Sequence, residues 1–98
     1  MKKPLFVFAK FHSQKDKVDE MKQLLKKFIG ETLENEPGCI SYNYLQSTED
    51  ETLFTSAEVW KDAEAEAAHW ETEHLKNLLA KLPEVVDGEA EVTKYNRI

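Results

Sequence analysis

Two histidines and one carboxylate are the residues of this chain best suited to acid–base chemistry. His69 and His74 stand five residues apart in a helix-forming stretch, soon after the segment Glu58-Val59-Trp60. Histidine exchanges protons near neutral pH, and a carboxylate can orient an imidazole by accepting its N–H. We therefore predict that His69 or His74 is a catalytic base and that Glu58 orients it. The plainer alternatives are exposed helix histidines and a Glu58 paired with a helix lysine.

Alternating positions around Glu58 supply candidate substrate contacts. Ser56, Glu58 and Trp60 are two residues apart, so in a strand their side chains share one face. Tyr42 and Tyr44 alternate in the same way in the preceding apolar segment. We predict that Trp60, Tyr42 and Tyr44 hold the ring of a small substrate and that Ser56 lies beside it. Ordinary core packing stays open for each aromatic residue, because strands favour aromatic residues in any case.

The residues that usually hold metals or nucleic acids are not arranged for either ligand. Cys39 is the only cysteine, and a net charge of −6 with pI near 5.0 disfavours binding to nucleic acid. Five residues turn a continuous helix by roughly 500°, which leaves His69 and His74 about 140° apart. A shared metal would need a helix break at Thr72 and a third ligand, which the sequence does not identify. We expect no metal and no bound cofactor.

The elements that position these residues follow from hydrophobic spacing. Apolar alternation predicts strands over 5–12, 39–48, 52–60 and 89–97, and steps of three and four predict a helix over 18–33. Asp62 and Thr72 are predicted to cap two further helical segments, the first over 63–71 and the second ended by Pro83. The order β-α-β-β-α-β predicts an α+β, ferredoxin-like fold: a four-stranded antiparallel sheet with its helices on one face.

The first predicted strand is apolar on both of its faces. Phe6 and Phe8 lie on one face, and Leu5 and Val7 lie on the other. Helices on one side leave the second apolar face bare, which predicts a two-fold homodimer. The 98 residues are expected to form a single domain, 1–98. No stretch approaches the ~20 apolar residues of a membrane helix, so we expect no membrane binding. A single cysteine excludes an intrachain disulfide, so we expect a cytoplasmic protein.

Several of these segments together resemble a known family. Glu36-Pro37-Gly38-Cys39, the alternating tyrosines, Glu58-Val59-Trp60 and two histidines ahead of a leucine-rich helix resemble the antibiotic biosynthesis monooxygenase (ABM) domain family. The resemblance covers nearly the whole chain. It implies a dimeric α+β barrel with an active site between the sheet and the helices of each protomer. It also implies oxidation of an aromatic diol or phenol by O₂ without a bound cofactor.

The same resemblance ranks the functions that we expect. In the haem-degrading branch an axial histidine occupies the position of Leu79, so haem is not expected here. The spacing of His69 and His74 resembles that of quinol-monooxygenase-like members and of the autoinducer-processing isomerase branch. The leading hypothesis is a cofactor-independent monooxygenase acting on a small phenol or hydroquinone. The alternatives are an isomerase of a small hydroxyketone or phosphorylated sugar signal in the same pocket, and a non-enzymatic dimeric small-molecule-binding protein.

Overall fold

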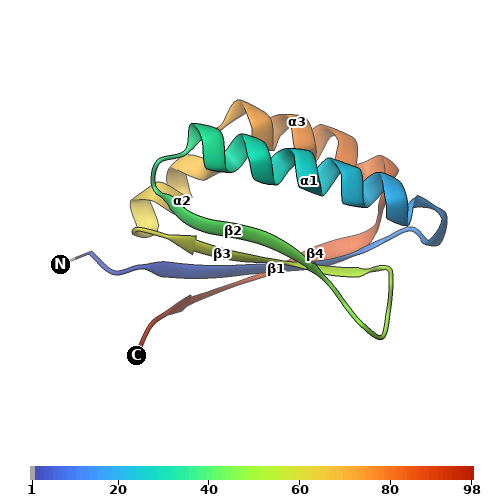
Figure 1. Ribbon diagram of the computed structural model, residues 1–98, viewed down its shortest axis with the longest axis horizontal. Helices are drawn as coiled ribbons and strands as arrows, with labels where there is room; N and C mark the ends of the chain where they lie inside the picture. The colour runs from blue at the N-terminus through green and yellow to red at the C-terminus, as the bar shows by residue number, and fades with distance from the viewer. Residues whose placement is uncertain (1) are drawn as a thin grey trace.

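A sheet of four antiparallel strands carries three α-helices on one face (Figure 1). The computed structural model describes residues 2–98. The elements are β1 (Leu5–Ser13), α1 (Val18–Asn35), β2 (Cys39–Gln46), β3 (Leu53–Trp60), α2 (Ala63–His69), α3 (Glu73–Lys81) and β4 (Val86–Asn96), with short 3₁₀ turns η1 (Lys15–Lys17) and η2 (Leu82–Glu84). The strand order is β2-β3-β1-β4. The predicted ferredoxin-like α+β fold is therefore confirmed.

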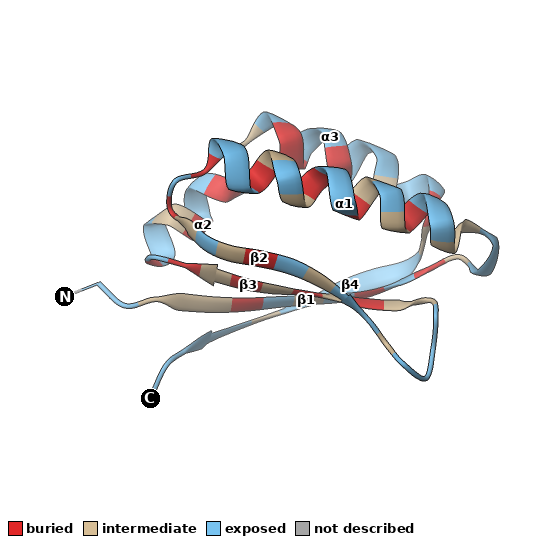
Figure 2. Cartoon of the chain, in the orientation of Figure 1, coloured by how far each residue is buried: buried red, intermediate tan, exposed pale blue. Residues whose placement is uncertain are grey.

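The long helix α1 covers the sheet with one apolar stripe. Met21, Leu25 and Phe28 recur at steps of three and four residues and are almost fully buried, as the red bands of Figure 2 show. The helix ends where Pro37 follows, because proline disfavours helical backbone in the residue before it. That residue, Glu36, has extended backbone, and its N–H still donates to the carbonyl of Thr32 at 2.9 Å. The helix end thereby holds the Glu36 side chain against the core.

The helical stretch after β3 is broken into two helices. Asp62 caps α2 by accepting the N–H of Ala65 at 2.8 Å, and Thr72 caps α3 by accepting the N–H of Leu75 at 3.4 Å. The Thr72 hydroxyl also donates to the carbonyl of His69 at 2.8 Å. That bond helps to end α2 at His69, two residues before the predicted boundary. The two histidines consequently lie on separate helices.

The last strand begins earlier than the spacing predicts. The alternation predicts a strand starting at Glu89, but β4 begins at Val86 and passes through Gly88. Gly88 has φ of +83°, a left-handed conformation that glycine adopts without strain. The pairing of β1 with β4 shifts register between Lys10 and His12, close to this position. The glycine therefore accommodates an irregularity in the strand pair rather than ending it.

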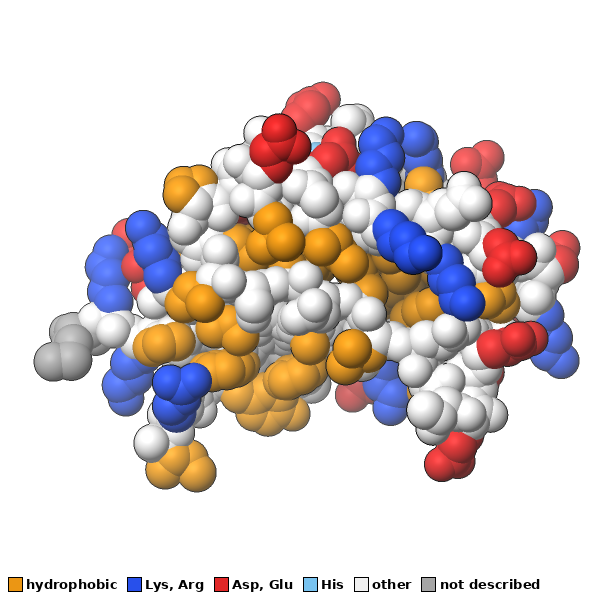
Figure 3. Space-filling view, in the orientation of Figure 1, with side chains coloured by type: hydrophobic (Ala, Val, Ile, Leu, Met, Phe, Trp, Pro, Cys, Tyr) orange, Lys and Arg blue, Asp and Glu red, His pale blue; other side chains and the backbone are white. Residues whose placement is uncertain are grey.

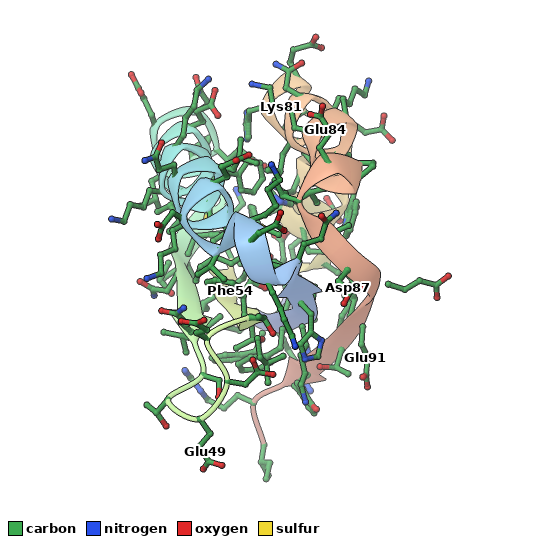
Figure 4. The ribbon with its side chains drawn as sticks, turned by 90° about the vertical axis from the view of Figure 1, so that its right-hand side faces the viewer. Glu49, Phe54, Lys81, Glu84, Asp87 and Glu91 are labelled. Carbon is green, nitrogen blue, oxygen red and sulfur yellow. The ribbon has the colours of Figure 1, made fainter. Side chains whose placement is uncertain are left out.

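The interior is divided into two packed clusters between the helices and the sheet. One cluster comprises Val7, Phe28, Tyr42, Trp60, Leu75 and Leu78. The other comprises Phe11, Met21, Leu25, Phe54 and Val85. Figure 4 shows the end of the molecule that contains the second of these clusters. Phe54 lies there between α1 and the sheet, and Glu49 marks the tip of the β2–β3 connection. The first cluster surrounds the polar residues described below.

The opposite face of the sheet has no helix over it. Phe8, Leu45 and Tyr95 are exposed there, and the rings of Phe8 and Tyr95 meet edge to face with centroids 5.7 Å apart. Figure 3 shows hydrophobic side chains gathered along the lower side of the molecule, away from the helices. Within residues 2–98, no helix combines the length and apolar character needed to span a membrane.

Candidate functional site

Two imidazoles converge on one carboxylate oxygen. Nδ1 of His69 lies 2.6 Å, and Nε2 of His74 lies 2.7 Å, from Oε2 of Glu36. The three residues come from the ends of α1, α2 and α3, and their exposed fractions are only 8% for Glu36, 3% for His69 and 9% for His74. We call Glu36, His69 and His74 the imidazole cluster.

The hydrogen bonds of this cluster determine which ring nitrogens are available for chemistry. An ionised carboxylate can only accept hydrogen bonds, so Nδ1 of His69 and Nε2 of His74 both donate to Glu36. The second nitrogens, Nε2 of His69 and Nδ1 of His74, make no hydrogen bond to any of residues 2–98. In a neutral ring that second nitrogen has a lone pair. Glu36 therefore fixes each imidazole through one ring nitrogen and leaves the other nitrogen available to accept a proton.

Aromatic rings fix the orientation of the imidazoles. The ring centroids of Trp60 and His69 are 4.6 Å apart, and that of Tyr42 lies 5.7 Å from that of His69. The ring of Phe28 lies 5.6 Å from that of His69 and 5.5 Å from that of His74. This packing restricts rotation of both imidazoles.

A second buried carboxylate lies on the sheet and bonds to different partners. Oε2 of Glu58 accepts the hydroxyl of Ser56 at 2.6 Å, and Oε1 accepts the indole N–H of Trp60 at 3.0 Å. Ser56 in turn accepts the backbone N–H of Ala9 at 2.8 Å, which joins the group to β1. Burial raises the pKa of Glu58, and the hydrogen bonds from Ser56 and Trp60 partly oppose this rise.

The two tyrosines extend this group across to β2. Tyr42 is paired with Glu58 in the β2–β3 register and Tyr44 with Ser56, so all four side chains share the helix-facing side of the sheet. The phenol oxygens of Tyr42 and Tyr44 are 3.1 Å apart. Burial, more than any charge, raises the pKa of both phenols. They remain protonated donors. We call Ser56, Glu58 and Trp60 with the two tyrosines the Glu58 cluster.

Three surface cavities reach these clusters from different sides. An open groove of about 400 Å³ is lined by Glu36, Trp60 and Thr72. A cavity of about 300 Å³ between α1 and α3 has His74 in its wall, together with Lys27 and Lys81. Tyr44 lines a third cavity, of about 250 Å³. A small molecule can therefore approach either cluster from solvent, although the rings between the clusters are closely packed.

The structure brings all seven predicted site residues into one region under the helices. These are His69, His74, Glu58, Trp60, Tyr42, Tyr44 and Ser56. The role assigned to Glu58 is different, since its hydrogen bonds run to Ser56 and Trp60 and not to an imidazole. Glu36 bonds both histidines instead. One signal for Glu36 was available in the sequence, namely an acidic residue at the helix end before Pro37.

The same arrangement removes the geometric objection to a metal ligand set. Helix α2 ends before Thr72, so His69 and His74 no longer diverge around one helix. Glu36 is a third candidate ligand, which the sequence did not identify. One ligand atom from each of Glu36, His69 and His74 lies within 4.8 Å of the other two.

Comparisons with known proteins agree with this architecture. The family model for antibiotic biosynthesis monooxygenase matches residues 4–81. A protein of Synechocystis sp. described as uncharacterized is 30% identical over 92 residues, which cover 94% of this chain and 62% of that protein. The chain thus spans less than two thirds of that relative.

Two solved structures show how closely the fold is shared. A conserved protein from Methanosarcina mazei Go1 is 34% identical, has a TM-score of 0.91, and aligns over 99% of this chain and 95% of its own. A candidate antibiotic biosynthesis monooxygenase from Caulobacter crescentus CB15 has a TM-score of 0.94 over 99% and 92% of the two chains, and at 21% identity it shows the fold alone. Because the family model matches most of its length and the Methanosarcina mazei protein is 34% identical over nearly the whole of both chains, the chain belongs to the antibiotic biosynthesis monooxygenase family.

Proposed function

We propose that this protein is a cofactor-independent monooxygenase that oxidises a small phenol or hydroquinone with O₂. The observation that carries the proposal is the imidazole cluster, in which one buried carboxylate holds two bases with their free nitrogens turned away from it. Family membership supports the reaction class. The aromatic residues Trp60, Tyr42 and Tyr44 suit a planar substrate.

The proposed chemistry starts with removal of a phenolic proton. Nε2 of His69 accepts the proton, and the positive charge that forms on the ring is stabilised by Glu36 behind Nδ1. A substrate phenolate in this buried region needs that counter-charge, because burial alone disfavours a phenolate, as the raised pKa of Tyr42 shows. The electron-rich anion then reduces O₂. One oxygen atom replaces a hydrogen on a ring carbon, the O–O bond breaks, and the other oxygen atom leaves as water. The substrate supplies all the electrons and is released as a quinone, so that a phenol and O₂ give a quinone and water.

The test is oxygen uptake with hydroquinones, catechols and simple phenols, followed by substitution of the proposed base. His69→Ala should lower turnover by about 10²–10⁴-fold, the usual loss for a general base. His12→Ala is the matched control, because His12 is exposed and lies 3.5 Å from Asp50, outside both clusters. Circular dichroism checks that each variant folds. Full activity in His69→Ala would move the base to His74, and full activity in the variant lacking both would overturn the imidazole mechanism.

One observation favours isomerisation of a phosphorylated hydroxyketone as the second candidate. The cavity beside His74 has Lys27 and Lys81 in its wall, and two cations suit a phosphate group. Base chemistry on a hydroxyketone would use the same imidazoles but no oxygen. Exchange of the substrate's carbon-bound hydrogen with solvent, without oxygen uptake, would support this candidate. Ligand binding with neither reaction would favour the non-enzymatic binding protein.

A homodimer formed through the bare sheet face is also part of this proposal. The exposed apolar residues Phe8, Leu45 and Tyr95 lie on the face that no helix covers. A second copy related by a two-fold axis would bury the same patch on both chains. Sedimentation at low micromolar concentration should give the mass of two chains. A stable monomer with native circular dichroism would contradict it.

A further inference from the structure

We propose that the imidazole cluster is also a binding site for a divalent transition-metal ion of the Zn²⁺ class, and that the bound ion switches off the base. Two imidazole nitrogens and one carboxylate oxygen are a common ligand set for such ions. Hard cations such as Mg²⁺ prefer oxygen ligands throughout, so this set selects against them. The binding part of the proposal is independent of the enzyme's reaction, whereas the inhibition rests on the proposed function.

The three candidate ligand atoms lie within 4.8 Å of one another. Nδ1 of His69 and Nε2 of His74 both point at Oε2 of Glu36, at 2.6 and 2.7 Å. A tetrahedral ion with bonds of about 2.0–2.1 Å spaces its ligand atoms roughly 3.3 Å apart. Loading the site therefore requires these two N–O distances to lengthen by roughly 0.6–0.7 Å. Glu36 lines the open groove, which provides space for that movement.

The charge balance of the cluster favours a cation. Glu36 is buried, and among residues 2–98 its ion-pair partners are the two histidines, with no lysine or arginine. Burying a carboxylate without a compensating charge is costly. A divalent cation bound at the cluster would supply that compensating charge.

The surroundings allow an ion to enter and hold the ligands in place. The groove at Glu36 and the cavity at His74 approach the cluster from two sides, so a hydrated ion has access and an open coordination position can keep a water. The rings of Phe28 and Trp60 restrain the imidazoles. Restrained ligands lose less conformational entropy on binding.

Metal binding at these atoms changes the tautomer of each ring. In the hydrogen-bonded state His69 has its proton on Nδ1 and a lone pair on Nε2. An ion at Nδ1 takes the lone pair of that nitrogen, and the proton moves to Nε2 of the same neutral ring. The nitrogen that accepts the substrate proton is then blocked. The same exchange applies to His74, with the two nitrogens reversed.

The experiment uses the full chain, freed of metal with a chelator, and titrates it with Co²⁺ as a spectroscopic probe and with Zn²⁺ in competition. We expect one Co²⁺ per chain, visible absorption typical of a four- or five-coordinate ion, loss of that absorption on adding Zn²⁺, and no effect of Mg²⁺. Removing a residue that hydrogen-bonds a metal ligand costs about 10–100-fold in metal affinity, so loss of a ligand itself should cost at least as much. Glu36→Gln, His69→Ala and His74→Ala should each show that loss, and His12→Ala should bind as the unaltered chain does.

The possible outcomes test the metal site and the proposed reaction independently. Absence of Co²⁺ binding to the unaltered chain would overturn the site without any variant having to fold. Binding that survives in the three cluster variants, or disappears in His12→Ala, would place the ion elsewhere and overturn it too. If the ion binds as proposed and oxygen uptake persists at saturating Zn²⁺, the site stands and its inhibitory role is wrong. Failure to find any oxidised phenol affects the proposed function and leaves the binding measurements unchanged.

Discussion

Two buried glutamates in this protein have almost the same exposure but different partners. Glu58 is held by neutral donors, the hydroxyl of Ser56 and the indole of Trp60, on the rigid surface of the sheet. Glu36, at the end of α1, is held by two imidazoles, one at the end of α2 and one at the start of α3. The first carboxylate is embedded in the packing of the core. The second lies where three helix ends meet, and its partners are bases.

This difference indicates that the imidazole cluster is the better candidate for chemistry and that the Glu58 cluster mainly stabilises the fold. Strand register positions the residues of the Glu58 cluster. The groups that donate hydrogen bonds to Glu58, from Ser56 and Trp60, are neutral. The imidazole cluster is assembled from chain segments that meet only in the folded protein. We therefore expect turnover to fall by different amounts when Glu36 and Glu58 are neutralised separately.

The largest expected effect comes from neutralising each carboxylate separately. Glu36→Gln should lower turnover by about 10²–10⁴-fold, since the amide cannot stabilise a protonated imidazole and the function of the base is lost. Glu58→Gln should lower it less, because the amide oxygen can still accept one of the two hydrogen bonds. Turnover numbers for the two variants at saturating substrate test the ranking. A greater loss in Glu58→Gln would reverse the roles assigned here.

Removing the ring of Phe28, which packs against both clusters, should destabilise the fold strongly. The Phe28 ring contacts Tyr42 as well as both histidines, and it is almost fully buried. Phe28→Ala should cost about 3–5 kcal/mol in the free energy of unfolding, measured in urea. Leu33→Ala, on the same helix and 49% exposed, is the control and should change stability by no more than about 0.5 kcal/mol. Similar losses in the two variants would contradict the packing described.

Two glycine substitutions should change stability in opposite directions. A Cβ on Gly38 would lie 2.6 Å from Cβ of Ala65, where the start of β2 passes α2 beside Glu36. Gly38→Ala should therefore cost about 1–3 kcal/mol through overpacking. Gly30 has no atom within 4 Å of an added Cβ, so Gly30→Ala within α1 should stabilise by about 0.5–1 kcal/mol. Thermal melts of the two variants give the signs, and a stabilised Gly38→Ala would show that α2 is not held at this distance.

The smallest expected effect is the pH dependence that Glu58 adds to stability. Its pKa in the folded protein is raised from 4.5, so the folded state retains this proton to higher pH than the unfolded state. The associated stability is complete below that value and is lost as pH rises through the raised pKa. Unfolding in urea at a series of pH values should show this decline in the unaltered chain and not in Glu58→Gln. Equal slopes would mean that burial does not perturb Glu58.

The strand-borne part of the site was predictable because its geometry is local. Alternation by two residues places Ser56, Glu58 and Trp60 on one face whatever the rest of the chain does. The caps at Asp62 and Thr72 likewise predict the interrupted helix. The helix-facing position of Tyr42 and Tyr44 follows from the same alternation once the hairpin register is known.

The Glu36 contacts were not predictable from the same local rules. Glu36 is 33 residues from His69 and 38 from His74, and these bonds depend on how three helices dock on the sheet. Nothing in the spacing of the sequence encodes that docking. Gly88 shows a second limit, because a glycine that breaks one strand can relieve an irregularity in another. Its meaning depends on the pairing with β1.

The two tryptophans on either side of His69 give the protein an optical reporter of its own chemistry. Trp60 is fully buried, with its ring centroid 4.6 Å from that of His69, whereas Trp70 is 43% exposed and 6.3 Å away. Emission from the buried indole should lie at shorter wavelength and resist quenching by iodide, while emission from the exposed indole should not. A protonated imidazole quenches a neighbouring excited indole by accepting an electron. Intrinsic fluorescence can therefore follow the proton on His69 in the unlabelled protein, before any substrate is known.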